Sequence, residues 1–342
     1  MTQAVTQAVT PAVTPAGTRP GDHRVGVLLE QRDLSPAETL ARAGLADELG
    51  VDSQWLVQLP NQRDSVVLLA AMAARTGRSG IGSAILPLYS RPPVVMAHTA
   101  LTLDELSGGR FTLGLGLGHR GVGEWMVGAG TTPPALAGTR EYLQITTSLI
   151  RDGEVSQDGK WFSGHASYTG PRRDGMAVHL GAFGPKLLEL AGELADGAIL
   201  WMCTPGYVRE HAVPALRRGL GRRADGRYPG GAGFEVAVVL NAAVTPEPEA
   251  DRAGFHRYLS AYLRVPTYRR LFTASGFGAQ AGAGRPDDDM VRALTAIGAA
   301  EDLRSKMDDY AAAGATRMLI SPTVSAHFDR DRFAATLRGG LG

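Results

Sequence analysis

The segment 181–186, Gly-Ala-Phe-Gly-Pro-Lys, combines residue types that are suited to binding an anion. Glycines at 181 and 184 allow backbone conformations and close approaches that a side chain would prevent. Pro185 suits the first position of a helix, where its missing N–H removes no hydrogen bond. The free N–H groups of that first turn, together with Lys186, would face a phosphate or a similar group. A tight strand-to-helix turn without a ligand is the alternative that the segment leaves open.

A second group of candidate residues lies in the segment 116–121, Gly-Leu-Gly-His-Arg-Gly. It matches the dinucleotide fingerprint formally, but no clear helix follows and the preceding strand is the fourth, not the first. His119 changes its charge near neutral pH and is a candidate proton donor, with Glu124 as the other titratable group of the loop. Arg120 is a candidate for holding an anionic cofactor tail or a substrate. Purely structural roles for His119 and Arg120 remain open.

The elements that must position these residues alternate between apolar runs and helical patterns. Strands are expected at 24–30, 51–57, 79–86, 110–116, 177–182, 196–202, 234–244 and 316–322. Helices are expected at 35–50, 64–77, 92–109, 138–153, 184–195, 207–222, within 247–313 with an interruption at 274–286, and at 327–338. Residues 160–168 predict a small hairpin insertion. Eight strand–helix units with buried, non-alternating strands predict a (β/α)8 TIM barrel, an α/β fold.

In a TIM barrel the residues that follow the strands gather at one rim, which holds the active site. The strand ends of this chain are Glu30, Gln58, 83–86, 116–120, 181–186, 201–203, Asn241 and Ser321. Trp201 could line a ring-shaped ligand or fill the top of the barrel. Cys203 is expected to act as a small hydrophobic residue, because no nearby base is evident that would lower its pKa.

The composition narrows the class of protein and its partners. The chain has 342 residues, of which 44% are hydrophobic, with 35 Lys and Arg against 34 Asp and Glu. This balance favours no nucleic-acid partner. A single cysteine excludes an internal disulfide framework and a Cys-based zinc site, and it fits a reducing, cytoplasmic setting. No metal site is expected.

The N-terminal residues 1–23 predict a disordered leader, because they repeat a Thr-x-Ala-Val unit and lack a basic segment followed by an apolar core. Residues 24–342 are expected to form one domain. No run of 18 apolar residues occurs in the sequence, so we expect no membrane-spanning segment.

Four motifs, in this order and spacing, resemble the luciferase-like monooxygenase superfamily. They are GVDSQWL (50–56), SGIGSAILPLYSRPP (79–93), LTLDELSGGRFTLGLGLGHR (101–120) and LGAFGPKLLELAGELADGAILWM (180–202). The resemblance covers about 24–340. GLGHR (116–120), LWM (200–202) and VPTYRRL (265–271) resemble more narrowly the branch that uses coenzyme F420, a deazaflavin.

The resemblance implies a cofactor ring at the strand ends, a non-proline cis peptide at Ala84–Ile85 behind it, and the cofactor phosphate in the loop 181–186. The cofactor-binding residues that it implies, together with the strand ends, are Gln58, Ser83, Ala84, Ile85, Gly116, Gly118, Arg120, Gly181, Ala182, Phe183, Gly184, Pro185, Lys186 and Trp201. Many relatives carry Asp-His after the second strand, where this chain has Gln58-Leu59-Pro60. His119 is therefore the first candidate for the proton donor, and Glu124 is the second catalytic candidate.

The function implied by this resemblance is hydride transfer between coenzyme F420 and an organic C=C or C=N bond of a small molecule. An FMN-dependent monooxygenase is the first alternative, since the same barrel hosts both cofactors. A cofactor-binding protein without turnover is the second, because the Asp-His pair is missing. Family resemblance also implies a homodimer.

Overall fold

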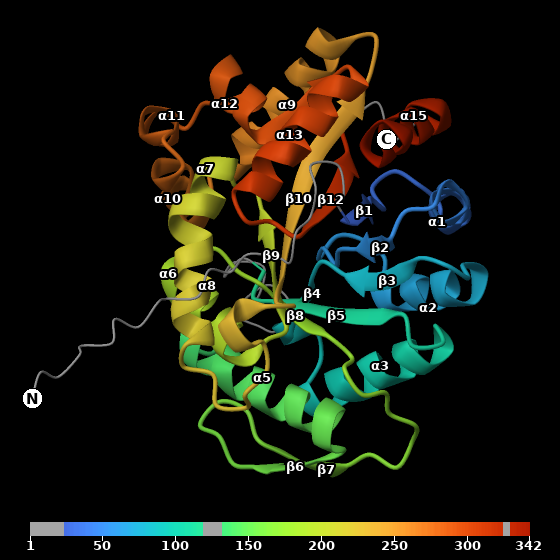
Figure 1. Ribbon diagram of the computed structural model, residues 1–342, viewed down its shortest axis with the longest axis vertical. Coiled ribbons are helices and arrows are strands. Elements are labelled where there is room, and N and C mark those ends of the chain that lie inside the picture. Colours follow the sequence, from blue (N-terminus) through green and yellow to red (C-terminus); the bar gives the residue numbers. More distant parts are fainter. Residues whose placement is uncertain (1–23, 119–131, 324–328) are drawn as a thin grey trace, which may run out of the picture.

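The computed structural model describes residues 24–118, 132–323 and 329–342. Eight parallel strands close into a barrel surrounded by helices (Figure 1). In order around the barrel, the strands are β1 (Arg24–Leu29), β2 (Ser53–Leu56), β3 (Gly80–Ser83), β5 (Phe111–Gly116), β8 (Val178–Gly181), β9 (Gly197–Trp201), β10 (Glu235–Val244) and β12 (Arg317–Pro322). Strand β12 pairs with both β10 and β1, which closes the ring. The predicted TIM barrel is confirmed.

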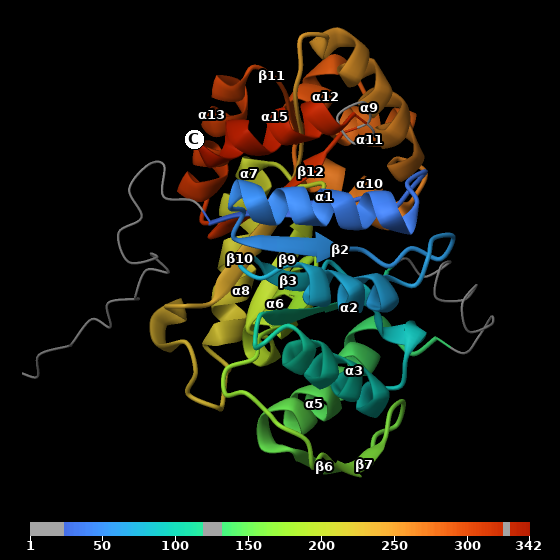
Figure 2. The same cartoon turned by 90° about the vertical axis from the view of Figure 1, so that its right-hand side faces the viewer.

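The helices that follow the strands cover the outside of the barrel. They are α1 (Pro36–Leu49), α2 (Ser65–Arg75), α3 (Pro93–Leu106), α5 (Ala135–Asp152), α6 (Pro185–Leu194), α8 (Val213–Leu220), α13 (Ala300–Ala312) and α15 (Arg330–Leu341). Figure 2 shows α1, α2, α3 and α5 one below another along one side of the molecule. Helix α1 begins and ends as predicted, because Ser35 and Glu38 form a capping box and Gly50 ends the helix in a left-handed conformation. Within the described ranges, no helix has both the length and the apolar character that crossing a membrane requires.

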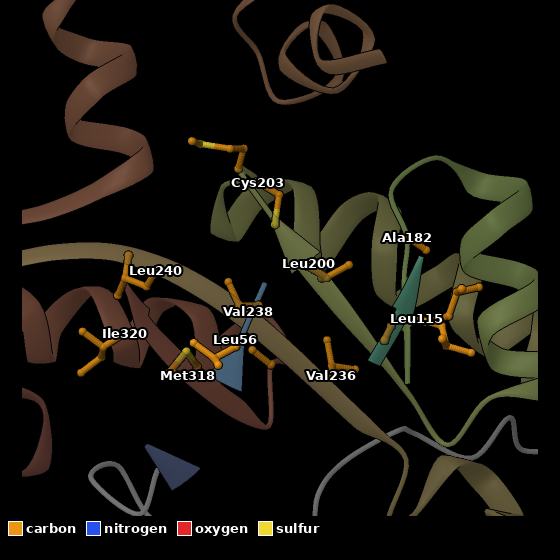
Figure 3. Packing of buried hydrophobic residues seen from close by; sticks show 14 of the residues in the cluster. Leu56, Leu115, Ala182, Leu200, Cys203, Val236, Val238, Leu240, Met318 and Ile320 are labelled. Carbon is orange, nitrogen blue, oxygen red and sulfur yellow. The ribbon is translucent and has the colours of Figure 1, made fainter. Parts of the chain in front are cut away.

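The core has two layers because each strand is buried on both faces. Outward-pointing side chains such as Val238 of β10 and Ile320 of β12 pack against the helices, and Figure 3 shows part of this layer. The opposite faces of the strands fill the barrel interior. This inner cluster consists of Leu28, Trp55, Ala84, Ile199, Ala237, Val239 and Leu319. Burial on both faces explains why the strands read as continuous apolar runs.

The segment between β10 and β12 contains a strand that the sequence pattern did not predict. It comprises α9 (Pro248–Tyr262), α10 (Pro266–Ala274), α11 (Gly278–Ala283), α12 (Asp288–Leu294) and β11 (Thr295–Gly298), and then α13. Strand β11 pairs in parallel with the last four residues of β10. Both β11 and α11 correct the sequence prediction, which placed helices over 247–313 interrupted at 274–286. Four residues between two helical patterns are too few to show a strand period.

The predicted hairpin at 160–168 is displaced in the structure. Its strands are β6 (Glu154–Gln157) and β7 (Gly164–Ser167), paired antiparallel, so residues 160–168 hold only the second strand. Strand β6 is only four residues long and half exposed, and it lacks the apolar run by which the other strands were recognised. The remaining elements of the described ranges are β4 (Leu86–Pro87), α7 (Pro205–Tyr207), short 3-10 helices at Leu88–Ser90 and Pro229–Gly231, and a π-helix at Val208–Ala212.

Candidate active site

The carboxyl ends of the strands bring the described part of the predicted site to one mouth of the barrel. Leu28, Ile199 and Leu319 point inward, so the residues two positions later on each strand point into the mouth. The side chains and glycines that form this ring are Glu30, Val57, Ile85, Gly116, Gly181, Trp201, Asn241 and Ser321.

One side of the mouth is formed by Gly116, Gly181 and the Ile85 side chain that lies against them, and we call this surface the floor. The Ala84–Ile85 peptide is cis, as the resemblance implied. A β-carbon on Gly116 would lie 2.9 Å from Ile85 Cγ1, and one on Gly181 would lie 2.8 Å from Ile85 Cγ2. The glycines therefore let the Ile85 side chain lie directly against the backbone of β5 and β8. This surface fits a planar ring.

Ser83 fixes the strand behind the floor. Its hydroxyl accepts a hydrogen bond from the Gly114 N–H (2.9 Å) and donates one to the Gly114 carbonyl (2.8 Å). Ser83 is fully buried. The hydroxyl thus joins β3 to β5 where the chain turns into the cis peptide.

The loop 181–186 adopts the geometry that an anion site needs. Gly184 has a φ of 101°, and no side chain caps the helix α6 that begins at Pro185. The Gly184 N–H donates a hydrogen bond to the Tyr207 hydroxyl (3.2 Å), and a β-carbon on Gly184 would meet nothing within 4 Å. Lys186 is exposed in the first turn. Open space at an uncapped helix N-terminus suits a phosphate, and that role stays a prediction.

Gln58 uses its side chain inside its own loop. Its Oε1 accepts hydrogen bonds from the backbone N–H (2.7 Å) and the hydroxyl (2.9 Å) of Ser65, and its Nε2 donates to the Leu59 carbonyl (2.9 Å). The Gln58 backbone N–H donates to the Ile85 carbonyl (3.1 Å). Gln58 therefore links the start of α2 to the peptide that carries the floor.

A cluster of aromatic side chains that the sequence analysis did not assemble includes Trp201 of the mouth, and we call it the aromatic wall. It consists of Phe183, Trp201, Tyr258, Tyr262 and Tyr268, with neighbouring ring centroids 4.7 to 6.2 Å apart. Helices α9 and α10, inserted after β10, supply its three tyrosines. The spacing of Tyr258 and Tyr262 by one helical turn was the available signal, but only the fold shows that it faces Trp201.

Three predicted residues, His119, Arg120 and Glu124, lie in 119–131, outside the described residues. Gly118 is the last residue described before that segment and has a φ of 63°. Cys203 is buried, and burial raises the pKa of its thiol to about 12. A thiol that stays protonated fits the predicted role of a small hydrophobic residue.

The opposite end of the barrel interior holds a buried polar cluster. Arg317 donates two hydrogen bonds to Glu235 (2.8 and 2.9 Å) and one to Ser53 (2.8 Å), which also accepts one from Trp55. The His179 ring stacks on Trp55, and its Nδ1 lies 3.8 Å from Glu235 Oε1. This cluster lies at the amino ends of the strands. Residues at that end of a TIM barrel usually contribute to stability and not to catalysis.

Stability is expected to fall at mildly acidic pH because of His179. Burial lowers the pKa of His179, and the charges of Glu235 and Asp196 offset only part of that shift. An unfolded histidine has a pKa of about 6.5. The unfolded state therefore binds more protons below that value, and the free energy of unfolding decreases as the pH falls toward the folded pKa.

The measurement is urea unfolding of wild type and His179→Gln between pH 7 and 5. We expect a smaller loss of stability in the variant, by up to about 1.4 kcal/mol per pH unit. His165→Gln is the control, because the His165 side chain is 55% exposed. Equal slopes in the wild type and His179→Gln would contradict the prediction.

Comparisons with known proteins agree with the fold. The model of the luciferase-like monooxygenase family matches residues 13–317. The chain is 24% identical over 306 residues to a 5,10-methylenetetrahydromethanopterin reductase of Methanolobus tindarius, covering 84% of this chain and 91% of that protein. It is 27% identical over 254 residues to the F420-dependent glucose-6-phosphate dehydrogenase of Kineococcus radiotolerans, covering 69% and 73%.

A solved structure supports the same fold. An F420-dependent secondary alcohol dehydrogenase in complex with an F420–acetone adduct matches with a TM-score of 0.76 and 17% identity, covering 93% of this chain and 99% of that one. At this identity the likeness concerns the fold alone. The family model, in contrast, covers most of the sequence, from before β1 to the first residue of β12. The chain belongs to the luciferase-like monooxygenase family of oxidoreductases.

Proposed function

We propose that the protein is a coenzyme F420-dependent oxidoreductase that transfers a hydride between the deazaflavin and a C=C or C=N bond of a small organic molecule. The observation that carries the proposal is the floor, where the Ile85 side chain lies against Gly116 and Gly181 at the barrel mouth. The similarity to the F420-dependent glucose-6-phosphate dehydrogenase of Kineococcus radiotolerans supports the choice of cofactor.

The residues proposed to hold the cofactor fit its two parts. The floor would hold the ring, with Trp201 at its edge, and the loop 181–186 would hold the phosphate at the open start of α6. When bound, the cofactor supplies the hydride, so the protein must position the ring against the substrate and provide a proton. His119, with Glu124 as the second candidate, is the proton donor proposed from the sequence.

The remaining expectations belong to the same proposal. We propose that residues 24–342 form one domain after a leader at 1–23, that two copies form a homodimer, and that the protein works in the cytoplasm, which its single cysteine favours.

Titration with F420 and with FMN tests the proposal. Binding is followed by the fluorescence of each cofactor, and turnover by mixing reduced cofactor, unsaturated substrates and protein in air. We expect F420 to bind and to be oxidised only when substrate is present. The family also includes FMN users, and oxygen-dependent turnover with FMN would replace the proposal by the monooxygenase alternative. Tight binding without turnover by any acceptor would favour a cofactor-binding protein.

Gly184→Val is expected to weaken F420 binding tenfold or more, about 1.4 kcal/mol. The branched side chain would enter the open space at the start of α6, where the phosphate is proposed to lie. Valine also strains a backbone with a φ of 101°. The measurement is the dissociation constant of F420 by fluorescence titration.

Gly50→Val is the matched control for that strain. Gly50 has a φ of 86°, and its β-carbon would also meet nothing within 4 Å, but it ends α1 away from the mouth. Both variants should lose stability, and only Gly184→Val should lose affinity. Equal affinity of the two variants would place the phosphate elsewhere.

A further inference from the structure

The polar side chains of Asn241 and Ser321 lie in the mouth, and the proposed function does not use them. Asn241 is 4% exposed and Ser321 is 2% exposed. The two residues are direct partners in the register of β10 and β12. Val239 and Leu319, two positions earlier on the same strands, belong to the inner cluster. Because side chains alternate along a strand, Asn241 and Ser321 point side by side into the mouth.

Neither side chain has a strong hydrogen bond. Among the described residues, the Asn241 amide makes one contact, from Nδ2 to the Met202 sulfur at 3.9 Å, and the Ser321 hydroxyl makes none. A thioether sulfur is only a weak acceptor. The Thr323 backbone N–H donates to the Ala242 carbonyl (2.8 Å), which holds Thr323 beside β10, and its hydroxyl is buried without a partner in the described ranges. Buried polar groups are normally paired, so unpaired ones at a barrel mouth indicate that a ligand supplies the missing bonds.

The pair lies across the mouth from the floor. In the ring of eight strands, β10 is the fourth neighbour of β3 in both directions, and β12 is the fourth neighbour of β5. Ile85 follows β3 and Gly116 ends β5, so the floor and the pair are on opposite sides of the mouth. A substrate that lies on a ring bound at the floor would therefore have Asn241 and Ser321 on its other side.

The chemistry of the pair favours a neutral, oxygen-bearing group. An amide and a hydroxyl can both donate and accept hydrogen bonds, which suits a carbonyl or a carboxamide. Among the described residues of the ring around the mouth, Glu30 is the only ionisable one, so no cation there could balance a carboxylate of the substrate. Trp201 of β9 pairs with Val239 of β10 and offers a flat, apolar surface beside the pair.

We propose that Asn241 and Ser321 determine substrate specificity by binding a neutral carbonyl or carboxamide group of the substrate, whose flat, apolar part lies on Trp201. The proposal rests on the proposed hydride transfer and names the class of its substrate, a planar molecule whose reducible bond is conjugated with that neutral group. By holding the group, the pair positions the reducible bond opposite the floor. Analogues without the group are rejected because they leave the polar atoms of the pair unpaired.

The first test is a calorimetric titration of three probes into the protein, with and without oxidised F420, which cannot donate a hydride. Cinnamamide, cinnamate and 1-phenylpropene share a phenyl ring and a C=C bond. Their end groups are neutral and polar, charged, and apolar, respectively. We expect cinnamamide to bind at least tenfold more tightly than the other two. Equal affinities for the three probes, or binding of none of them, would overturn the proposal.

Variants of the pair test whether it causes this preference. Asn241→Leu and Ser321→Ala should weaken cinnamamide binding at least tenfold and leave the affinity for 1-phenylpropene unchanged. Thr336→Val is the control, because the buried Thr336 hydroxyl of α15 is fully paired. It accepts from the Val244 N–H (3.0 Å) and donates to the Arg332 carbonyl (2.8 Å). Thr336→Val should bind cinnamamide as the wild type does. Wild-type affinity for cinnamamide in both variants of the pair would overturn their role.

Urea unfolding of the same variants requires neither probe nor cofactor. The midpoints of Asn241→Leu and Ser321→Ala should stay at or above that of the wild type, because each variant loses a buried polar group that lacks a strong partner. The midpoint of Thr336→Val should fall, because it loses two hydrogen bonds. If the variants of the pair lost as much stability as Thr336→Val, Asn241 and Ser321 would serve the stability of the barrel, and the proposal would be wrong.

Titration with F420 distinguishes failure of this proposal from failure of the proposed function. Asn241→Leu and Ser321→Ala should bind F420 as the wild type does, because they lie across the mouth from the floor. A wild type that binds and oxidises F420 without preferring cinnamamide would overturn the role of the pair alone. A wild type that binds cinnamamide through the pair but does not bind F420 would overturn the proposed function and support the pair as a binding site for a neutral group.

Discussion

Arg317→Met is expected to lower the free energy of unfolding by about 3–5 kcal/mol. Arg317 and Glu235 are each only 12% exposed, and two hydrogen bonds join them inside the barrel. Burial raises the pKa of Glu235, but the polar and charged groups beside it, among them Arg317 with its charge and hydrogen bonds, outweigh burial, so the net pKa is lowered and Glu235 is a carboxylate at neutral pH. Removing Arg317 leaves that charge buried without its main partner. The measurement is equilibrium unfolding in urea at pH 7.

Two further variants separate this cause from a general loss of packing. Arg24 also contacts Glu235 (3.5 Å), but its side chain is 66% exposed. Arg24→Met should therefore lower the free energy of unfolding by less than about 1 kcal/mol. The double variant Arg317→Met with Glu235→Leu removes both charges and should recover part of the loss. If Arg24→Met and Arg317→Met lowered the free energy of unfolding equally, burial of the Arg317–Glu235 pair would not be the cause of the lost stability.

The sequence was sufficient to predict the barrel because each of its eight units carries a repeated physical signal. Strands that are buried on both faces read as apolar runs, and helices such as α1 carry explicit caps at Ser35 and Gly50. Strand β11 has no such signal, since its four residues follow α12 directly and pair only with the extension of β10. Its formation depends on a distant partner, which a local pattern does not show.

The candidate site was predictable where a loop carries its own chemistry. The loop 181–186 has the open helix start that its glycines and proline indicated. Gln58 was expected to contact the cofactor, but its amide caps α2, a role that depends on how the loop folds back.

Gly114 shows how a structure can change the meaning of a glycine. Glycines recur at every second position from 114 to 118, a pattern that would open the backbone for a flat ligand. In the structure, a β-carbon on Gly114 would lie 1.8 Å from the Ser83 carbonyl oxygen and 2.8 Å from Ile199 Cδ1. Gly114 therefore makes room for the neighbouring strand, and a place at the cofactor is proposed only for the floor with Gly116 and Gly181.

Gly114→Ala is accordingly expected to lower the free energy of unfolding by about 3 kcal/mol, from overpacking together with weakened hydrogen bonds of Ser83. Non-bonded atoms normally stay about 3.5 Å apart, so β3 and β5 must separate to admit the new methyl group. The two groups that it would meet, the Ser83 carbonyl and the Ile199 side chain, both belong to the packed barrel. Separation displaces Ser83, and with it the Ala84–Ile85 peptide that carries the floor. F420 affinity should then fall at least tenfold, about 1.4 kcal/mol.

Two variants identify the close approach of the strands as the cause. Ser83→Ala removes the hydroxyl but leaves Gly114 room to approach, so it should lose stability and keep most of the F420 affinity. Gly44→Ala adds the same methyl inside α1, where nothing lies within 4 Å, and should stabilise the protein by about 0.5–1 kcal/mol. Urea unfolding and fluorescence titration of the three variants measure both effects. If Gly114→Ala bound F420 as tightly as the wild type, the position of the floor would not depend on the contact between β3 and β5. The proposed binding site of the cofactor ring would then be wrong.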